Sequence, residues 1–150
     1  MAAILGFTRP ISFEGQAAIW LEQLARSSSA TAEPYPFPFA GDELDYRPLL
    51  QAAIHDRKRG RNRAEIARAF QRGVAQGLCD AVLSICASNG IDTVVLSGGV
   101  FQNELLLEDI SALRGDSVNI WMNHAGPPND GGISLGQAAL AAFGRFDEIH

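Results

Sequence analysis

The chain has 150 residues, of which 47% are hydrophobic, and a formal net charge of −5. This length can bury one ordinary hydrophobic core, so we expect a single domain over residues 1–150, or a large part of one. The acidic balance excludes a nucleic-acid-binding surface over the chain as a whole, because contacts with phosphate dominate nucleic-acid affinity.

The sequence predicts a cytoplasmic protein with no membrane partner. No apolar run approaches the roughly 20 residues that span a bilayer, and the N-terminus lacks the basic-then-apolar layout of a signal peptide. Cys79 and Cys86 stand seven residues apart in a helical pattern. That spacing separates their Cα atoms by about 10 Å, which is too far for a disulfide, so buried thiols in a reducing compartment are expected.

In chain order, helical patterns come first and are separated by a proline-rich loop. A helix is expected to begin near Glu14, with Ser12 and Glu14 near its start as capping groups or as groups that suit the helix dipole. The alternation of proline and aromatic residues at 35–39 then favours a loop with short edge strands. Helices follow from Arg47 to Arg57 and from about Arg63 to Ser88. The last of these has a buried apolar stripe, which consists of Ile66, Ala69, Phe70, Val74, Gly77, Leu78, Val82 and Ile85.

The second half of the chain alternates strands with helices. The stretch "IDTVVLSGG" predicts a short strand, "NELLLEDISALR" a helix, "SVNIWMN" a second strand and "GGISLGQAALAAFG" a closing helix. This alternation implies a parallel, or mostly parallel, α/β sheet. Ligands of such sheets bind outside the carboxyl ends of the strands, where both glycine pairs of this sequence fall.

The first glycine pair follows the first of these strands. Gly98 and Gly99 can adopt backbone angles that are closed to other residues, and without a Cβ they let main-chain N–H groups approach an anion. Asn103 stands near the start of the next helix, where it could cap the helix or bind a polar ligand group. A tight strand-to-helix turn with no ligand is the alternative.

The second glycine pair follows Asp130 in "PPNDGGISLGQA". Asp130 could simply be an N-cap. However, turns at the ends of successive parallel strands should converge on one crevice, and a carboxylate there could hold a divalent cation beside phosphate oxygens.

These motifs resemble a known family. The stretches "SGGVFQNELLL" and "PPNDGGISLGQAALAA", with "ISFEGQAA", "YPFP" and "GDELDYRPLL", are similar in order and wording to the C-terminal part of the HypF carbamoyltransferases of [NiFe]-hydrogenase maturation. The glycine motifs more distantly resemble the tRNA threonylcarbamoyladenosine enzymes and the O-carbamoyltransferases of natural-product pathways. The resemblance implies an α/β fold, namely the C-terminal lobe of an actin/sugar-kinase-like (ribonuclease H-like) fold, with a mixed sheet and flanking helices.

The resemblance also implies a function. HypF uses carbamoyl phosphate and ATP to make carbamoyl-adenylate, and transfers the carbamoyl group to the C-terminal cysteine of HypE for cyanide ligand synthesis. Carried over by position, Gly15, Gly98, Gly99 and Asn103 would contact the nucleotide, whether ATP or carbamoyl-adenylate. Asp130 would be a ligand of a divalent metal ion, whose identity stays open.

The sequence departs from the family in ways that suggest a fragment. The family's metal site also needs two closely spaced histidines from the preceding lobe, and this chain has only His55, His124 and His150. His124 follows a strand end near Asp130 and could touch the ligand; the other two are not expected to be ligands. The partners implied are a HypE-like, cysteine-ended acceptor and a missing N-terminal lobe or complementary chain. The isolated chain is expected to be inactive.

Two alternatives stay open. The chain could be a non-catalytic remnant or docking module of the same fold, although a remnant would have no physical need for two unhindered glycine pairs. Transfer of threonylcarbamoyl to tRNA is disfavoured by the absence of a general basic surface. The basic run "HDRKRGRNR" is interpreted as a solvated helix connection rather than an RNA site. Trp20 and Trp121 are expected in the core or at the lobe interface.

Overall fold

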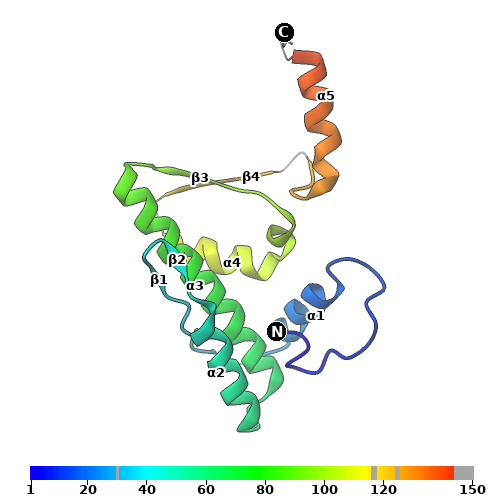
Figure 1. The fold of residues 1–150 in the computed structure, drawn as a ribbon, viewed down its shortest axis with the longest axis vertical. Helices are drawn as coiled ribbons and strands as arrows, with labels where there is room; N and C mark the ends of the chain where they lie inside the picture. Colours follow the sequence, from blue (N-terminus) through cyan, green and yellow to red (C-terminus); the bar gives the residue numbers. More distant parts are fainter. Residues whose placement is uncertain (30, 116–117, 124–125, 144–150) are drawn as a thin grey trace.

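The computed structural model describes residues 1–29, 31–115, 118–123 and 126–143 (Figure 1). Its helices and strands follow the predicted order. They are α1 (Gln16–Arg26), β1 (Phe39–Ala40), β2 (Glu43–Leu44), α2 (Tyr46–Lys58), α3 (Arg63–Asn89), β3 (Thr93–Leu96), the short 3-10 helix η1 (Gly99–Gln102), α4 (Glu104–Arg114), β4 (Asn119–Met122), the 3-10 turn η2 (Asp130–Gly132) and α5 (Ile133–Phe143).

The long helix α3 is the centre of the structure, and α1, α2 and α4 pack against it. It begins where the Asn62 side chain accepts a hydrogen bond from Ala64 N at 2.8 Å, and it ends at Gly90, which has a φ of 64°. The predicted stripe is buried or half-buried except at its end, where Ile85 is 46% exposed. The prediction for Ile85 was wrong because Ile85 lies on a side of α3 that no described element covers, whereas the next residue, Cys86, is buried.

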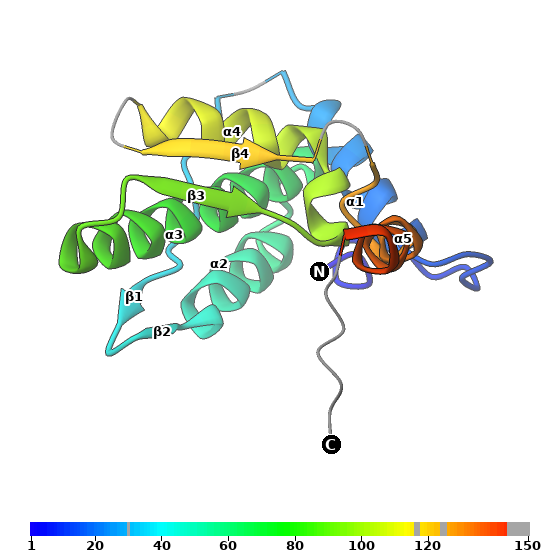
Figure 2. The same cartoon turned by 90° about the horizontal axis from the view of Figure 1, so that it is seen from above.

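The strands form two separate two-stranded sheets. β3 and β4 are parallel, as predicted, with Thr93 opposite Asn119 and Leu96 opposite Met122. β1 and β2 form a small antiparallel hairpin, so both strand senses occur but not within one mixed sheet of the described residues. Figure 2 shows the β3–β4 pair lying along α3 and α4. Trp121 of β4 is 66% exposed, so it lies outside the core of this chain.

An extended segment before β1 runs directly across α3. Tyr35 N donates a hydrogen bond to Ala69 O at 3.1 Å. A Cβ added at Gly73 would lie 2.4 Å from Tyr35 O, and one added at Gly77 would lie 2.5 Å from Phe37 O. These two glycines therefore make the close contact between helix and segment possible.

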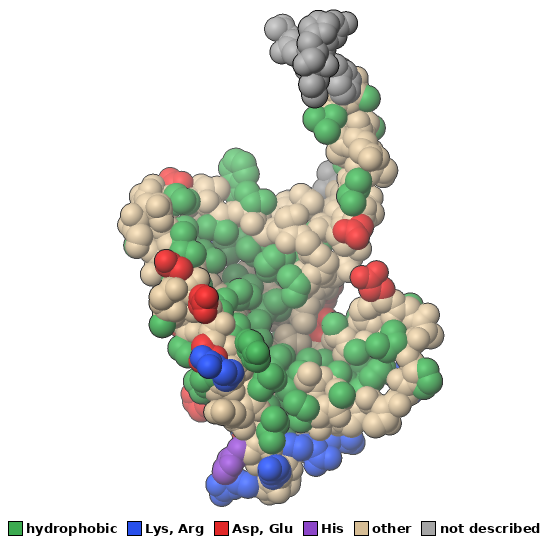
Figure 3. Space-filling model, viewed as in Figure 1, with side chains coloured by type: hydrophobic (Ala, Val, Ile, Leu, Met, Phe, Trp, Pro, Cys, Tyr) green, Lys and Arg blue, Asp and Glu red, His purple; other side chains and the backbone are tan. Residues whose placement is uncertain are grey.

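The end of the same segment is held by a polar group. The Tyr35 hydroxyl donates to Asp56 Oδ2 at 2.6 Å, and Arg61 Nη1 donates to the same oxygen at 2.7 Å. These bonds, the Tyr35 bond foremost, hold the pKa of Asp56 below its usual range. Arg61 and Arg63 thus both have structural partners, since Arg63 Nη1 donates to Leu5 O at 3.1 Å, and the other basic residues of the run are exposed. Figure 3 shows basic side chains gathered at this end of the molecule.

Three smaller predictions have clear outcomes. Ser12 and Glu14 do not cap α1: its N-cap residue is Gly15, without a side-chain cap, and Ser12 N instead donates to Gln16 Oε1 at 2.8 Å. Cys79 and Cys86 are buried free thiols, as predicted, and burial raises the pKa of Cys79. Among the described residues, no helix has the length and apolar character to cross a membrane.

Candidate functional site

The two glycine turns meet at the carboxyl ends of β3 and β4, as predicted from the parallel sheet. Gly98 N donates a hydrogen bond to Pro128 O at 2.7 Å, which joins the first turn to the second. Gly98 has a φ of 105°, a conformation that glycine adopts at little cost. A Cβ added at Gly99 would lie 3.7 Å from the Asn129 Cβ, an ordinary contact. Gly99 is exposed, so this junction is open to a ligand.

The hydrogen bonds at the junction leave main-chain donors free. In η1, Phe101 N donates to Gly98 O and Asn103 N donates to Val100 O. The N–H groups of Gly99 and Val100 begin this short helix, and neither has an acceptor among the described residues. Successive free N–H groups at an exposed turn are the usual donors to a phosphate or carboxylate.

Asn103 performs a structural role at this site. Its Oδ1 accepts from Leu106 N at 2.9 Å, which caps α4, and its Nδ2 donates to Gln71 Oε1 of α3 at 3.2 Å. The side-chain amide therefore already has partners for both ends, and it fixes α4 relative to α3. Any ligand contact by Asn103 would have to exchange or share one of these bonds.

Glu22 is a site residue that the sequence reasoning missed. Its side chain is only 10% exposed, and its Oε1 accepts from Leu105 N in the first turn of α4 at 3.2 Å. A carboxylate is favourable at a helix N-terminus, so Glu22 holds α1 against α4. Glu22 and Asn103 thus occupy two amides of the first turn of α4, those of Leu105 and Leu106, and further donors without an acceptor among the described residues lie in η1. A carboxylate next to Leu21 on the buried face of α1 was the signal in the sequence.

Asp130 lies on the other side of the junction, at the start of η2. The alternative that Asp130 is an N-cap was wrong, because Asn129 is the cap residue: its Oδ1 accepts from Gly131 N at 3.0 Å. Asp130 is exposed and makes no hydrogen bond or ion pair with another described side chain. A Cβ added at Gly132 would lie 2.7 Å from Pro127 O, so the turn requires glycine there.

The metal site expected around Asp130 is not assembled by the part of the chain that the structure describes. Within that part, no group of three or more His, Cys, Asp or Glu side chains lies close enough together to hold a metal ion. The carboxylate of Asp130 could serve as one hard oxygen ligand of a divalent metal ion, and the other ligands would have to come from elsewhere. His124 lies outside the described residues.

Gly15 is not joined to this junction by any hydrogen bond of the described residues. It is exposed at the start of α1, with a φ of 79°, and a Cβ added there would meet open space. Its carbonyl accepts from Ile19 N at 2.9 Å within the helix. The structure therefore brings together Gly98, Gly99, Asn103 and the Asp130 turn, but it does not bring Gly15 into contact with them.

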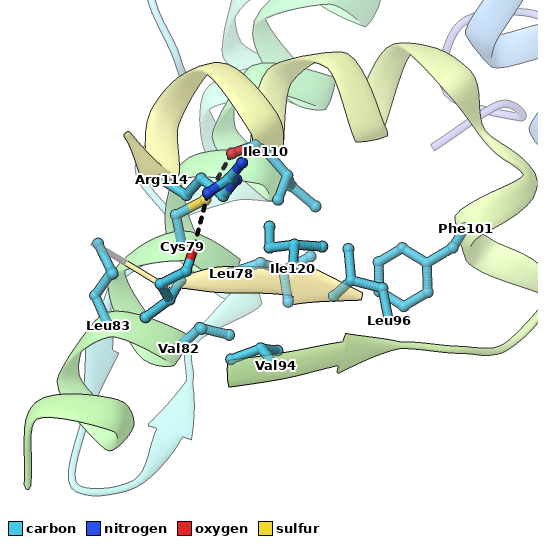
Figure 4. Close-up of a pocket in the computed structure, with 11 residues that line it drawn as sticks. Leu78, Cys79, Val82, Leu83, Val94, Leu96, Phe101, Ile110, Arg114 and Ile120 are labelled. Atoms are coloured by element: carbon cyan, nitrogen blue, oxygen red, sulfur yellow. Dashed lines mark hydrogen bonds between the residues drawn. The ribbon is translucent and has the colours of Figure 1, made fainter. Parts of the chain in front are cut away.

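The cavity beneath the sheet is not part of this site. It has a volume of about 60 Å³ and lies between α3, α4 and the β3–β4 pair (Figure 4). Leu78, Val82 and Ile120 line it, and so does Arg114, whose Nη1 donates to Val118 O at 2.7 Å. Because its lining is apolar and its volume suits only a small molecule, we interpret it as a gap in the core.

Comparisons with known proteins agree on one family. A family model described as "Carbamoyltransferase, Kae1-like Domain, second subdomain" matches residues 1–137. The carbamoyltransferase HypF of Synechocystis sp. is 35% identical over 143 residues, which cover 91% of this chain and 18% of that protein. A crystal structure of full-length HypF in the phosphate- and nucleotide-bound form is 36% identical, with a TM-score of 0.79, over 93% of this chain and 19% of that one.

A weaker match extends to a second class of enzyme. The tRNA N6-adenosine threonylcarbamoyltransferase of Symbiobacterium thermophilum is 30% identical over 103 residues, which cover 61% of this chain and 29% of that protein. The predicted resemblance and the predicted α/β fold class are confirmed by these findings. The chain spans about 18% of the length of the HypF relative from Synechocystis.

Proposed function

Because the chain belongs to the HypF carbamoyltransferase family, we propose that it supplies one half of a nucleotide site in a carbamoyl-transferring enzyme. The observation that carries this proposal is the junction of the two glycine turns. There Gly98 N is bonded to Pro128 O, while the N–H groups of the exposed residues Gly99 and Val100 have no acceptor among the described residues. This arrangement suits phosphate oxygens of ATP or carbamoyl-adenylate.

The charges at the junction support a nucleotide site that this chain shares with another part of the enzyme, rather than a site that it forms alone. The turns supply main-chain donors and one carboxylate, Asp130, but within the described residues no cationic side chain forms an ion pair or hydrogen bond at this junction. The negative charge of a nucleotide would be balanced by a divalent metal ion that Asp130 helps to hold. A metal ion there would neutralise phosphate charge; the main-chain donors would orient the phosphates.

The acceptor and the remaining machinery follow from the family as proposals. We propose that the carbamoyl group passes from carbamoyl-adenylate to the C-terminal cysteine of a HypE-like protein, for the cyanide ligands of a [NiFe]-hydrogenase. An N-terminal lobe, in the same chain or a separate one, would provide the other ligands of the metal and close the nucleotide site. Without that lobe the chain is expected to be inactive in transfer and to work in the cytoplasm only as part of the larger enzyme.

Replacing Gly99 with valine is expected to weaken nucleotide binding at least about tenfold, or 1.4 kcal/mol. The added Cβ has room in the fold, but the side chain would cover the free N–H groups. Isothermal titration of ATP and ADP, with and without Mg²⁺, measures the effect in the free chain. The same titration is made in a HypF chimera, defined as Synechocystis HypF whose matching segment is replaced by this chain.

A matched variant, Gly136→Val, controls for the change of side chain in the free chain, because Gly136 also has open space and lies in α5. Unchanged affinity in Gly99→Val, in a protein that binds ATP, would contradict the assignment of the phosphate to this turn. A HypF chimera that folds but does not bind ATP would favour the alternative of a non-catalytic remnant.

Replacing Asp130 with alanine is expected to remove the Mg²⁺-dependent part of ATP affinity and to leave the metal-free part unchanged. The carboxylate is exposed and makes no bond to the described fold, so stability should be unaffected. Titrations of the HypF chimera at several Mg²⁺ concentrations make this comparison. Equal Mg²⁺ dependence in the wild type and in Asp130→Ala would overturn the metal-ligand role, and Asp130→Glu is the conservative control.

The tRNA-directed alternative has less support. The match to the tRNA threonylcarbamoyltransferase covers a smaller share of this chain than the HypF match, and the chain is acidic overall.

A further inference from the structure

Helix α5 extends away from the rest of the protein (Figure 1). All eleven of its residues are exposed, whereas each of the other four α-helices has buried residues. An isolated helix of this length is only marginally stable in water, because the free energy gained from a few turns of hydrogen bonds does not exceed the cost of nucleating the helix. The helix therefore needs a packing partner that the described chain does not provide.

The composition of α5 indicates an apolar partner. Its sequence, "ISLGQAALAAF", contains no charged residue. Ile133, Leu135, Leu140 and Phe143 are 56%, 60%, 65% and 87% exposed. At 100° per residue these four side chains span nearly half of the circumference, and the alanines widen that face further. A solvent-exposed helix of a globular protein would have polar residues over much of this arc.

A second uncovered surface lies on the β3–β4 pair. Val95 and Trp121 stand opposite each other in the parallel register and are 62% and 66% exposed, and Val100 of η1 is 59% exposed. Parallel strands are almost always covered on both faces, and a two-stranded sheet is marginal by itself. The β3–β4 face and α5 are thus both incomplete, and both adjoin the two glycine turns.

We propose that α5 is a docking helix whose occupant is the first subdomain of the same Kae1-like domain, and that docking fixes the position of Asp130. This inference rests on the proposed function. The family description names the matched region a second subdomain, and the HypF relatives are about five times longer than their match. A second copy of this chain fits less well, because an 11-residue helix is only about 16 Å long and offers too little area for a standard interface.

The link to Asp130 is covalent and short. η2 ends at Gly132 and α5 begins at the next residue, Ile133, so the axis of α5 sets the direction of the turn that presents the carboxylate. Leu135 also packs near Gly126, on the approach to that turn: a Cβ added at Gly126 would lie 3.3 Å from Leu135 Cδ2. Docking of α5 would therefore order the Asp130 side of the site when the two subdomains meet.

Hydrogen exchange of the HypF chimera, without nucleotide, tests the docking. The amides of α5 should exchange at least about 100-fold more slowly than in the free chain, because packing protects them. Leu140→Asp should abolish this protection. The control is Ile85→Asp, at an exposed aliphatic residue of α3, which should leave it intact. Exchange of α5 in the wild-type chimera as fast as in the free chain would overturn the proposal.

The free chain gives an independent test by light scattering and exchange over a range of concentrations. We expect a monomer with unprotected α5. A dimer that Leu140→Asp dissociates would assign the helix to a second copy, and protected α5 in the monomer would assign it to the chain's own core; both outcomes overturn the proposal. Because exchange is measured without nucleotide, loss of docking is distinguishable from loss of ATP binding, which titration of the same chimera reports.

Discussion

Replacing Arg68 with methionine is expected to lower the free energy of unfolding by about 3 kcal/mol. Arg68 of α3 makes a two-pronged ion pair with Asp109 of α4, with Nη2 donating to Oδ1 at 2.8 Å. The two side chains are only 21% and 13% exposed. Methionine would preserve much of the packing volume but leave the Asp109 carboxylate shielded from water without its partner. The stability is lost because a poorly hydrated charge then has no opposite charge beside it.

Urea denaturation of the free chain and a double-mutant cycle measure this effect. Arg68→Met combined with Asp109→Leu should recover part of the lost stability, because no unpaired charge remains. Arg47→Met is the matched control: Arg47 is 74% exposed in its pair with Asp45, so its loss should cost less than about 1 kcal/mol. Equal costs for Arg68→Met and Arg47→Met would contradict the importance given to burial.

Replacing Gly73 with alanine should destabilise the chain by about 2 kcal/mol, despite the gain in helix propensity of about 1 kcal/mol. The new Cβ would lie 2.4 Å from Tyr35 O and 2.8 Å from Leu49 Cδ1, so the extended segment must move away from α3. That movement also strains the bond from Tyr35 N to Ala69 O.

Thermal and urea unfolding check this prediction. Gly136→Ala in α5 is the matched control, since its Cβ meets open space and the change should be neutral or stabilising. If Gly73→Ala were as stable as the wild type, the close approach of the segment to α3 would be refuted. Adding Gly77→Ala should increase the loss, because Gly77 makes the same kind of contact with Phe37 O.

The sequence predicted the convergence of the two glycine turns, but not which groups at the junction are free. Consecutive parallel strands place their carboxyl ends at one edge, so the meeting of Gly98 with the turn before Asp130 follows from strand order. Occupation of the α4 amides by Glu22 depends on how α1 packs across α4, and no local pattern contains that distance. The choice of Asn129 over Asp130 as the cap also depended on the exact path of the turn.

The sequence by itself determined the order and kind of the elements, because helical and strand periodicity, glycine turns and proline breaks are properties of neighbouring residues. The glycine motifs also identified the family, which the comparisons confirm. Only the tertiary structure decided which apolar residues are covered. Ile85 and Trp121 have the character of core residues, yet their burial depends on whether a second element reaches them. The same holds for α5. Its apolar face can be predicted from the sequence, but whether another segment of the described chain packs against it depends on the tertiary structure.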